Sequence, residues 1–133
     1  MFVTTKTILF SDADPAGVLF FARYLALAHD AYEEFMASRG MMFREQLEEK
    51  GLLLPVIHAE SNHRLPLRLG DKTVIHVRVA EVTRRTFTIA YEFRTPDGEV
   101  AARCRTVHAA VDRQAGRAIR LPEHLTAALG PVD

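Results

Sequence analysis

The sequence predicts an α+β fold in which a curved antiparallel sheet wraps around one long helix. Three observations lead to this prediction. Apolar residues recur with helical spacing between Phe21 and Arg39. Several segments with alternating apolar and polar residues follow this helix, and one strand-like segment precedes it. A helix with an apolar stripe and a sheet with one apolar face bury these surfaces against each other, so we expect the two layers to pack together.

The composition is that of one globular domain covering residues 1–133. Hydrophobic residues make up 48% of the 133 residues and charged residues 26%, which allows a core in a chain small enough to gain from oligomerisation. Seventeen basic and seventeen acidic residues cancel, so no net field favours nucleic acid or a membrane as a partner. No signal peptide or membrane-spanning pattern is present, and the single Cys104 lies in a strand-like run. We therefore expect a soluble cytoplasmic protein in which Cys104 is a packing residue.

The first half of the chain predicts one strand and two helices. A weakly alternating strand is expected over residues 2–10. The long helix should run from about Phe21 to Arg39 and end at Gly40, a typical C′ residue. A short second helix is expected at residues 42–50. The apolar stripe of the long helix consists of Phe21, Tyr24, Leu25, Ala28, Tyr32, Phe35 and Met36.

The second half predicts a sheet of consecutive antiparallel strands. Residues 52–69 form a long extended segment, in which Pro55 and Pro66 suit an edge or a bend. Strands should follow at residues 72–82, 86–93 and 100–111, with a brief pairing at 117–121 and a short terminal helix after Pro122. Such a sheet leaves free edges and an outer face that we expect to be apolar or small. Pairing of two sheets in a homodimer would cover an edge.

Two carboxylates, Asp12 and Asp14, lie in a turn directly before the long helix. Pro15 and Gly17 make this loop rigid, because proline fixes its own φ and glycine accepts a positive φ. A purely structural interpretation is a turn that caps the helix. A calcium loop is disfavoured, because Arg23 stands where an EF-hand needs a bidentate glutamate.

A catalytic interpretation assigns the chemistry to Asp14, with Asp12 shaping the loop. Asp14 would act on an electrophilic carbonyl whose developing charge is stabilised by a backbone N–H at the helix start. An acyl thioester can be attacked by the carboxylate itself or by a water that the carboxylate deprotonates. No serine nucleophile elbow, phosphate-binding loop or dinucleotide glycine motif is present, so serine hydrolase and nucleotide-dependent functions lack support.

The segment Phe10-Ser-Asp-Ala-Asp-Pro-Ala-Gly17, followed by Val-Leu-Phe-Phe-Ala-Arg-Tyr24, resembles the signature of hotdog-fold acyl-CoA thioesterases. The resemblance extends from about residue 6 to residue 112 and is to the 4-hydroxybenzoyl-CoA and 1,4-dihydroxy-2-naphthoyl-CoA thioesterase group. It implies a hotdog fold and hydrolysis of an aromatic or otherwise bulky acyl-CoA. It also implies that Asp14 is the catalytic nucleophile or general base and that the backbone N–H of Phe21 is the donor to the thioester oxygen. Many relatives have a histidine where this chain has Phe21.

The same resemblance implies four substrate-binding residues. His29 would face the acyl pocket, although a structural histidine beside the apolar stripe is the ordinary alternative. His58 would lie along the pocket wall. Arg84 and Arg85, in a loop between two strands, would contact the coenzyme A phosphates, because guanidinium groups suit phosphate oxygens. Ordinary surface charge is the alternative for both arginines.

The resemblance further implies acyl-CoA and water as substrates, no metal or other cofactor, and a homodimer that pairs further into a homotetramer. Two other functions stay open. One is a thioesterase that acts on acyl-carrier-protein thioesters. A basic surface that extends beyond Arg84 and Arg85, around the opening through which the substrate enters, would favour this function. The other is a non-catalytic acyl-CoA-binding protein, since a fold alone does not decide function. Asp14 weighs against the second, because a binder gains nothing from a desolvated carboxylate beside a thioester.

Overall fold

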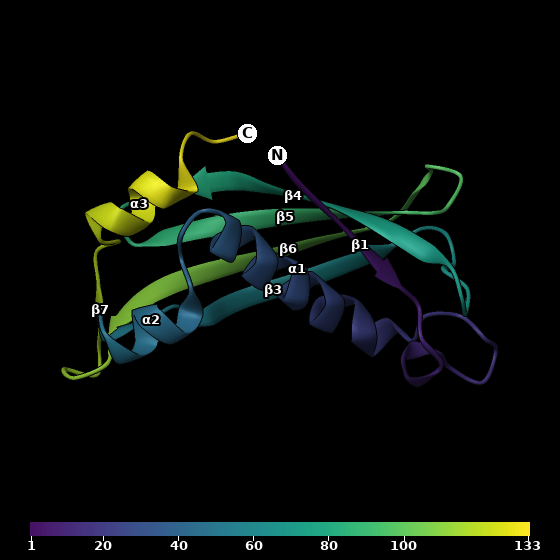
Figure 1. Cartoon of the computed structure of the whole chain (residues 1–133), viewed down its shortest axis with the longest axis horizontal. Helices are drawn as coiled ribbons and strands as arrows, with labels where there is room; N and C mark the ends of the chain where they lie inside the picture. The colour runs from purple at the N-terminus through teal and green to yellow at the C-terminus, as the bar shows by residue number, and fades with distance from the viewer.

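The computed structural model describes all 133 residues as a sheet that curves around the long helix α1 (Tyr24–Ser38). Figure 1 shows α1 crossing one face of the sheet. The short helices α2 (Phe43–Glu48) and α3 (Glu123–Leu129) lie at one end of the strands, and the loop that precedes α1 lies at the other end. The predicted α+β fold, a curved antiparallel sheet around one long helix, is confirmed.

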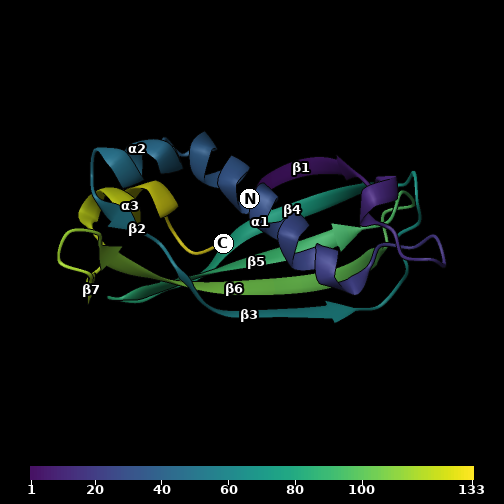
Figure 2. The same ribbon diagram turned by 90° about the horizontal axis from the view of Figure 1, so that it is seen from below.

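The sheet has seven strands and every pairing in it is antiparallel. Four of the strands follow the order β1-β4-β5-β6, and β6 also pairs with β3, β2 and β7, as Figure 2 lets the reader trace. Only β6 pairs with β3, so β3 is a free edge. The strands are β1 (Phe2–Thr7), β2 (Leu52–Leu53), β3 (Val56–His63), β4 (Lys72–Val82), β5 (Thr86–Arg94), β6 (Val100–Asp112) and β7 (Arg117–Ile119).

Three boundaries differ from the sequence prediction. The first strand ends at Thr7, and residues 10–12 form a 3-10 turn instead of continuing it. The predicted extended segment is broken at Pro55, and residues 64–71 are largely irregular. The first turn of the predicted helix, Phe21–Arg23, is a 3-10 turn that runs directly into α1. Pro55 and Pro66 account for the interruptions of the extended segment, because proline cannot donate a hydrogen bond to a neighbouring strand.

The core forms between α1 and the inner face of the sheet. Tyr24, Ala28, Tyr32, Phe35 and Met36 of the predicted stripe are buried, whereas the ring of Phe21 is 67% exposed and lies outside the core. The helix ends as predicted: Gly40 has φ of 79°, and Met41 N–H donates to Met36 O at 2.8 Å. Cys104 is buried in β6, and burial raises the pKa of its thiol to about 12. A packing role for Cys104 is thus confirmed.

The outer face of the sheet, opposite α1, is charged at one end and carries small or apolar residues, among them Thr88, Ala90, Val107 and Ala109, toward the other, so the expectation of an apolar or small-residue face holds for only part of it. The polar positions of the alternating strands point to this face. It carries four arginines, Arg78, Arg94, Arg103 and Arg105. No helix of the chain has the length and apolar content needed to cross a membrane, and the longest, α1, has 15 residues.

Candidate functional site

The loop between β1 and α1 is held as a narrow hairpin by its own backbone. Ala13 and Leu19 form an isolated antiparallel bridge. Inside this bridge, the N–H of Asp14 donates to the carbonyl of Val18 at 2.9 Å. Gly17, with φ of 76°, permits the tight reversal that a residue with a side chain would rarely adopt. The hairpin therefore fixes Asp14 opposite Val18, just before the start of the helix.

The Asp14 carboxylate is oriented by one of its oxygens and free at the other. Oδ1 accepts hydrogen bonds from the backbone N–H groups of Ala16 at 2.8 Å and Val18 at 3.3 Å. Oδ2 has no hydrogen-bond partner in the chain, and the residue is half-buried. The hydrogen bonds to Oδ1 hold the side chain in place, while the lone pairs of Oδ2 remain free. Such a carboxylate can serve as a general base or as a nucleophile.

Asp12 has a structural role, as its position in the loop predicted. It is 3% exposed, and it accepts the backbone N–H of Leu9 at 3.0 Å. Arg23 approaches its other oxygen with Nε at 3.0 Å and Nη2 at 2.9 Å. This charge-assisted pair ties the end of β1 to the 3-10 turn that starts the helix. A calcium loop is contradicted, because the guanidinium group occupies the carboxylate that a calcium ion would need.

Phe21 supplies an unpaired backbone donor beside this loop. Its N–H is at the first position of the 3-10 turn and has no acceptor in the chain, as is usual for the first N–H groups of a helix. Its ring packs edge-on against the ring of Phe20, with 4.8 Å between centroids. Leu9 and Phe10 are also exposed nearby. The loop thus combines an anchored carboxylate, a free N–H at the positive end of a helix and an exposed apolar surface.

A second feature is a cavity of about 210 Å³ between α1, α2 and β2. His29, a predicted substrate-binding residue, lines this cavity, and its ring centroid lies 5.6 Å from that of Tyr32. The hydroxyl of Tyr32 is buried and has no hydrogen-bond partner. The sequence pattern marked Tyr32 only as a core residue, because a stripe position does not reveal an unpaired hydroxyl. The lining is mostly apolar and consists of His29, Tyr32, Phe43, Gln46, Leu47, Leu52, Leu53 and Leu54.

Behind Tyr32 lies a buried polar chain that the sequence did not reveal. The hydroxyl groups of Tyr91 and Thr106 are 2.7 Å apart, and Thr106 is 2.8 Å from Nε2 of His108. The His108 ring stacks on Tyr32 with 4.3 Å between centroids. Burial lowers the pKa of His108 to about 4; the nearby Leu54 backbone offsets part of this effect, and the His29 charge adds to it. His108 is therefore neutral at pH 7.

Burial also raises the pKa of Tyr32 and of Tyr91 well above the ordinary value for a phenol. For Tyr32 the neighbouring Tyr91 adds to the effect, whereas the hydrogen bond from Thr106 opposes it for Tyr91. Both hydroxyls are neutral at physiological pH and act as hydrogen-bonding groups. The wall behind the cavity is therefore uncharged.

The other predicted residues lie apart from Asp14 within one chain. His58 is exposed on the edge strand β3 and lies 3.3 Å from Glu60. His63 points to the opposite face, where its ring centroid is 4.3 Å from that of Tyr24 at the start of α1, so the two histidines do not face each other.

Arg84 and Arg85 lie in the turn after β4, at the far end of the sheet from the loop that holds Asp14. The loop is joined to the first end of β4, where Ile8 N–H donates to Asp71 O at 2.8 Å. Because β4 has 11 residues, the turn is roughly 35 Å from the loop at about 3.3 Å per residue. A single chain places Phe21 directly after the hairpin that holds Asp14, and His29 in the lining of the cavity, but it does not bring the two arginines to either.

Residues 8–129 of the chain match the family model described as the Thioesterase-like superfamily. Among named relatives, the chain is similar to the 1,4-dihydroxy-2-naphthoyl-CoA hydrolase of Synechococcus elongatus, with 31% identity over 121 residues, covering 90% of this chain and 88% of the relative. It is equally similar to the enzyme of the same name from Rippkaea orientalis, with 31% identity over 123 residues, covering 91% and 89%.

Solved structures show the same fold. The structure of a 1,4-dihydroxy-2-naphthoyl-CoA thioesterase from Synechocystis superposes with a TM-score of 0.89 at 23% identity, covering 96% of this chain and 94% of that one. A 4-hydroxybenzoyl-CoA thioesterase mutant in complex with 4-hydroxybenzoyl-CoA superposes with a TM-score of 0.88 at 18% identity, covering 97% and 98%. The hotdog fold expected from the sequence is confirmed.

Proposed function

Because this chain belongs to the Thioesterase-like superfamily, we propose that it is an acyl-CoA thioesterase that hydrolyses an aromatic or bulky acyl-CoA. The observation that carries the proposal is the Asp14 carboxylate, anchored through Oδ1 and open at Oδ2, beside the unpaired N–H of Phe21. Relatives with 31% identity are named 1,4-dihydroxy-2-naphthoyl-CoA hydrolase. A ring-bearing acyl group of that kind is therefore the substrate class that we favour.

The reaction needs only water as a second substrate. As a general base, Asp14 takes a proton from water through Oδ2 while the water oxygen bonds to the thioester carbon. The carbonyl oxygen becomes negatively charged and accepts a hydrogen bond from the N–H of Phe21. When the carbonyl re-forms, the carbon–sulfur bond breaks, and the coenzyme A thiolate leaves and takes up a proton. The products are a carboxylic acid and the free thiol.

Asp14 as a nucleophile gives the same products in two steps. Oδ2 bonds to the thioester carbon and expels the thiolate, which leaves a mixed anhydride between Asp14 and the acyl group. Water then cleaves this anhydride and restores the carboxylate. The open Oδ2 serves both routes, so the geometry of the loop is equally suited to each.

We further propose that the cavity beside His29 receives the acyl ring. An apolar cavity of about 150 Å³ is enough to hold benzene, and this one has about 210 Å³. His29 is eight residues after Phe21, which is about 12 Å along a helix. An aromatic acyl group that lies along α1 would extend its ring substituents toward the imidazole of His29, with the unpaired hydroxyl of Tyr32 behind it.

The complete site is proposed to form between two copies of the chain. The edge strand β3 presents eight largely exposed residues, with backbone groups on one side unpaired. If two copies pair through β3 about a two-fold axis, their sheets run antiparallel. The Asp14 end of one chain then lies beside the Arg84 and Arg85 end of the other, within reach of the phosphates of a bound coenzyme A.

His58 lies on this same edge strand, so the proposed pairing brings it to the dimer interface. The further pairing of dimers into a homotetramer stays a prediction.

We also propose a cytoplasmic location, which the free thiol of Cys104 supports because thiols persist in a reducing compartment.

The proposal is tested by measuring thiol release from benzoyl-, hydroxybenzoyl-, dihydroxynaphthoyl- and fatty acyl-CoA. Wild type should hydrolyse the aromatic esters fastest. Asp14→Asn should lower turnover at least about a hundredfold, because the amide can neither take the proton nor attack.

Asp97→Asn is a matched control, since Asp97 is exposed in the β5–β6 turn and makes no hydrogen bond through its side chain. It should retain wild-type turnover. If Asp14→Asn is as active as wild type, Asp14 is only a turn residue and this assignment fails. If wild type binds these esters but releases no thiol, the protein is a non-catalytic acyl-CoA binder.

A further inference from the structure

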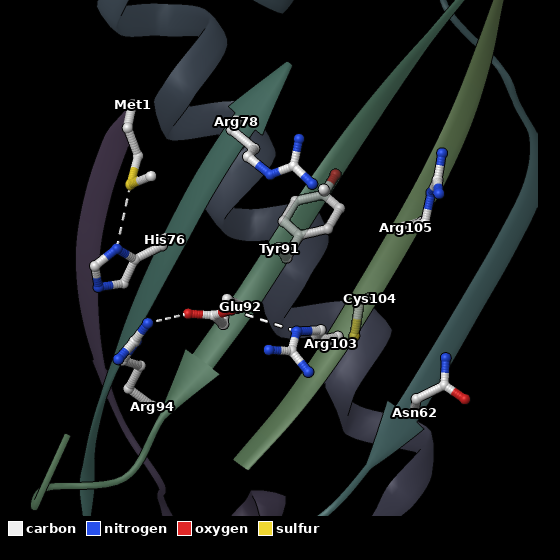
Figure 3. A pocket seen from close by; sticks show the side chains of 11 residues that line it. Met1, Asn62, His76, Arg78, Tyr91, Glu92, Arg94, Arg103, Cys104 and Arg105 are labelled. Carbon is white, nitrogen blue, oxygen red and sulfur yellow. Dashed lines mark hydrogen bonds and ion pairs between the residues drawn. The ribbon is translucent and has the colours of Figure 1, made fainter. Parts of the chain in front are cut away.

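A hollow of about 320 Å³ lies on the outer face of the sheet, away from the Asp14 loop and the cavity beside His29. Figure 3 views this face, with α1 behind the strands. The register places Arg78 of β4, Ala90 of β5 and Arg105 of β6 side by side. Cross-strand neighbours point to the same face of a sheet. Two long guanidinium side chains therefore stand on either side of a methyl group, and this size difference opens the hollow.

The arginines around the hollow are in excess over the acids. Glu92 is the one carboxylate in the lining, and it ion-pairs with Arg94 and with Arg103, whose Nε is 3.4 Å from Oε2. Arg78 and Arg105 have no such partner. Their guanidinium groups thus remain unpaired in a chain whose acidic and basic residues cancel overall.

Glu60, on the neighbouring strand β3, is in register with Arg105 but forms no ion pair with it. Its carboxylate lies 3.3 Å from the imidazole of His58 instead. The Arg105 guanidinium is therefore left without an ion pair at the edge of the sheet.

This charge distribution selects the occupant. A two-fold interface centred on the hollow would set it against its own copy, so unpaired arginines would face unpaired arginines. Juxtaposed like charges oppose such an interface. A phosphate group, in contrast, offers oxygens that accept the paired N–H donors of guanidinium groups.

We propose that the hollow binds a phosphate-bearing anion of about the size of pyrophosphate, held between Arg78 and Arg105. Glu92 restrains Arg94 and Arg103 at one side, which leaves the two free guanidinium groups as the principal donors. The site is distinct from the Arg84 and Arg85 turn, since Arg78 precedes Arg84 by six residues, or roughly 20 Å of strand. Binding here does not depend on thioester hydrolysis.

The test is a calorimetric titration of pyrophosphate into full-length protein at about 0.15 M ionic strength. An Arg84→Gln/Arg85→Gln background removes the predicted coenzyme A phosphate contacts from the measurement. Adding Arg78→Gln/Arg105→Gln should weaken pyrophosphate binding at least about tenfold, because charge-assisted hydrogen bonds are lost. Adding Arg117→Gln/Arg120→Gln instead, which removes two exposed arginines at β7 and just after it, should leave the affinity within about threefold.

Two results would overturn the proposal. One is that pyrophosphate does not bind in the background variant, or binds equally well after Arg78 and Arg105 are replaced. The other is that replacing them changes the oligomeric state in sedimentation without any anion, since the hollow would then be a contact between copies. A competition arm identifies the source of the phosphate: displacement of pyrophosphate by coenzyme A supports a nucleotide as the ligand, and lack of displacement supports free pyrophosphate.

Discussion

Asp12 and Asp14 are two residues apart and have different roles because their surroundings differ. Both oxygens of Asp12 are engaged, one by the N–H of Leu9 and the other by Arg23. A carboxylate buried to this degree needs its partner, and losing Arg23 would leave an uncompensated charge. Asp14 keeps one oxygen free at a half-buried position. Only a free oxygen can accept a proton from water or attack a carbonyl, so the chemistry belongs to Asp14.

His108 should make folding stability depend on pH. Its pKa is lowered from 6.5 to about 4 by burial, so between these values the unfolded chain binds a proton more readily than the folded one. The contribution of His108 is present above pH 6.5 and is lost as the pH falls toward 4. We expect His108 alone to cost about 2 kcal/mol of unfolding free energy between pH 7 and pH 5, measured by urea denaturation.

His108→Gln is the comparison for this measurement, because glutamine does not titrate. The variant should be less stable than wild type at pH 7, where it loses the stacking on Tyr32 and Phe87, but its stability should change less toward pH 5. An equally steep loss of stability in both proteins would show that other groups cause it.

At the scale of the element, α1 serves two parts of the proposed site. Its 3-10 start presents the N–H of Phe21 beside the Asp14 loop, and its second turn carries His29 to the cavity. The opposite face of the helix is buried in the core. One rigid helix can therefore set the spacing between the reacting carbonyl and the groups that contact the acyl ring.

His29→Ala should change substrate preference more than it lowers the best rate. The imidazole is proposed to contact ring substituents and not the thioester. The loss of about one hydrogen bond should therefore lower kcat/KM for hydroxylated aromatic esters about tenfold more than for unsubstituted benzoyl-CoA. Thiol release measured across both ester types checks this. Asp30→Asn, at an exposed neighbouring position, should leave the preference unchanged. Equal losses on all esters after His29→Ala would argue against a pocket role.

At the scale of the whole molecule, the distance between the two ends of β4 separates the predicted residues. Asp14 belongs to one end and Arg84 to the other, roughly 35 Å apart at about 3.3 Å per residue. This is longer than a pantetheine arm. An antiparallel pairing of two copies through β3 removes the conflict, because it places opposite ends of the two chains side by side.

Mixing two defective chains should restore activity if the site is shared. Asp14→Asn lacks the carboxylate and Arg84→Gln/Arg85→Gln lacks the phosphate contacts, but a mixed dimer contains one site with both. Random pairing makes half of the dimers mixed, and each mixed dimer has one intact site out of two. The activity at low substrate should therefore reach about a quarter of the wild-type activity. Thiol release from the co-expressed pair measures it.

The control for this experiment replaces the second chain by one that carries all three substitutions, Asp14→Asn with Arg84→Gln and Arg85→Gln. No pairing of that chain with Asp14→Asn yields an intact site, so no activity should return. If the first mixture shows only the average of its two components, then Asp14 and the arginines act within the same chain or do not share a site.

Local chemistry determined most of the fold. Alternation fixed β4 as residues 72–82 and the helical stripe fixed α1, because side-chain periodicity follows directly from backbone geometry. The Asp loop was also readable, since Pro15 and Gly17 restrict φ whatever surrounds them. Family resemblance then singled out Asp14, and the hairpin that orients its carboxylate agrees with that choice without testing it.

Only the tertiary structure decided which residues are neighbours across the sheet. The Tyr91–Thr106 hydrogen bond and the row of Arg78, Ala90 and Arg105 depend on strand register. The unpaired hydroxyl of Tyr32 depends on how α1 packs against the sheet. Register is set by contacts between segments far apart in sequence, and a slip of one residue would turn every side chain to the other face. Periodicity within one strand therefore gives its two faces, whereas the pairing of strands decides what each face can bind.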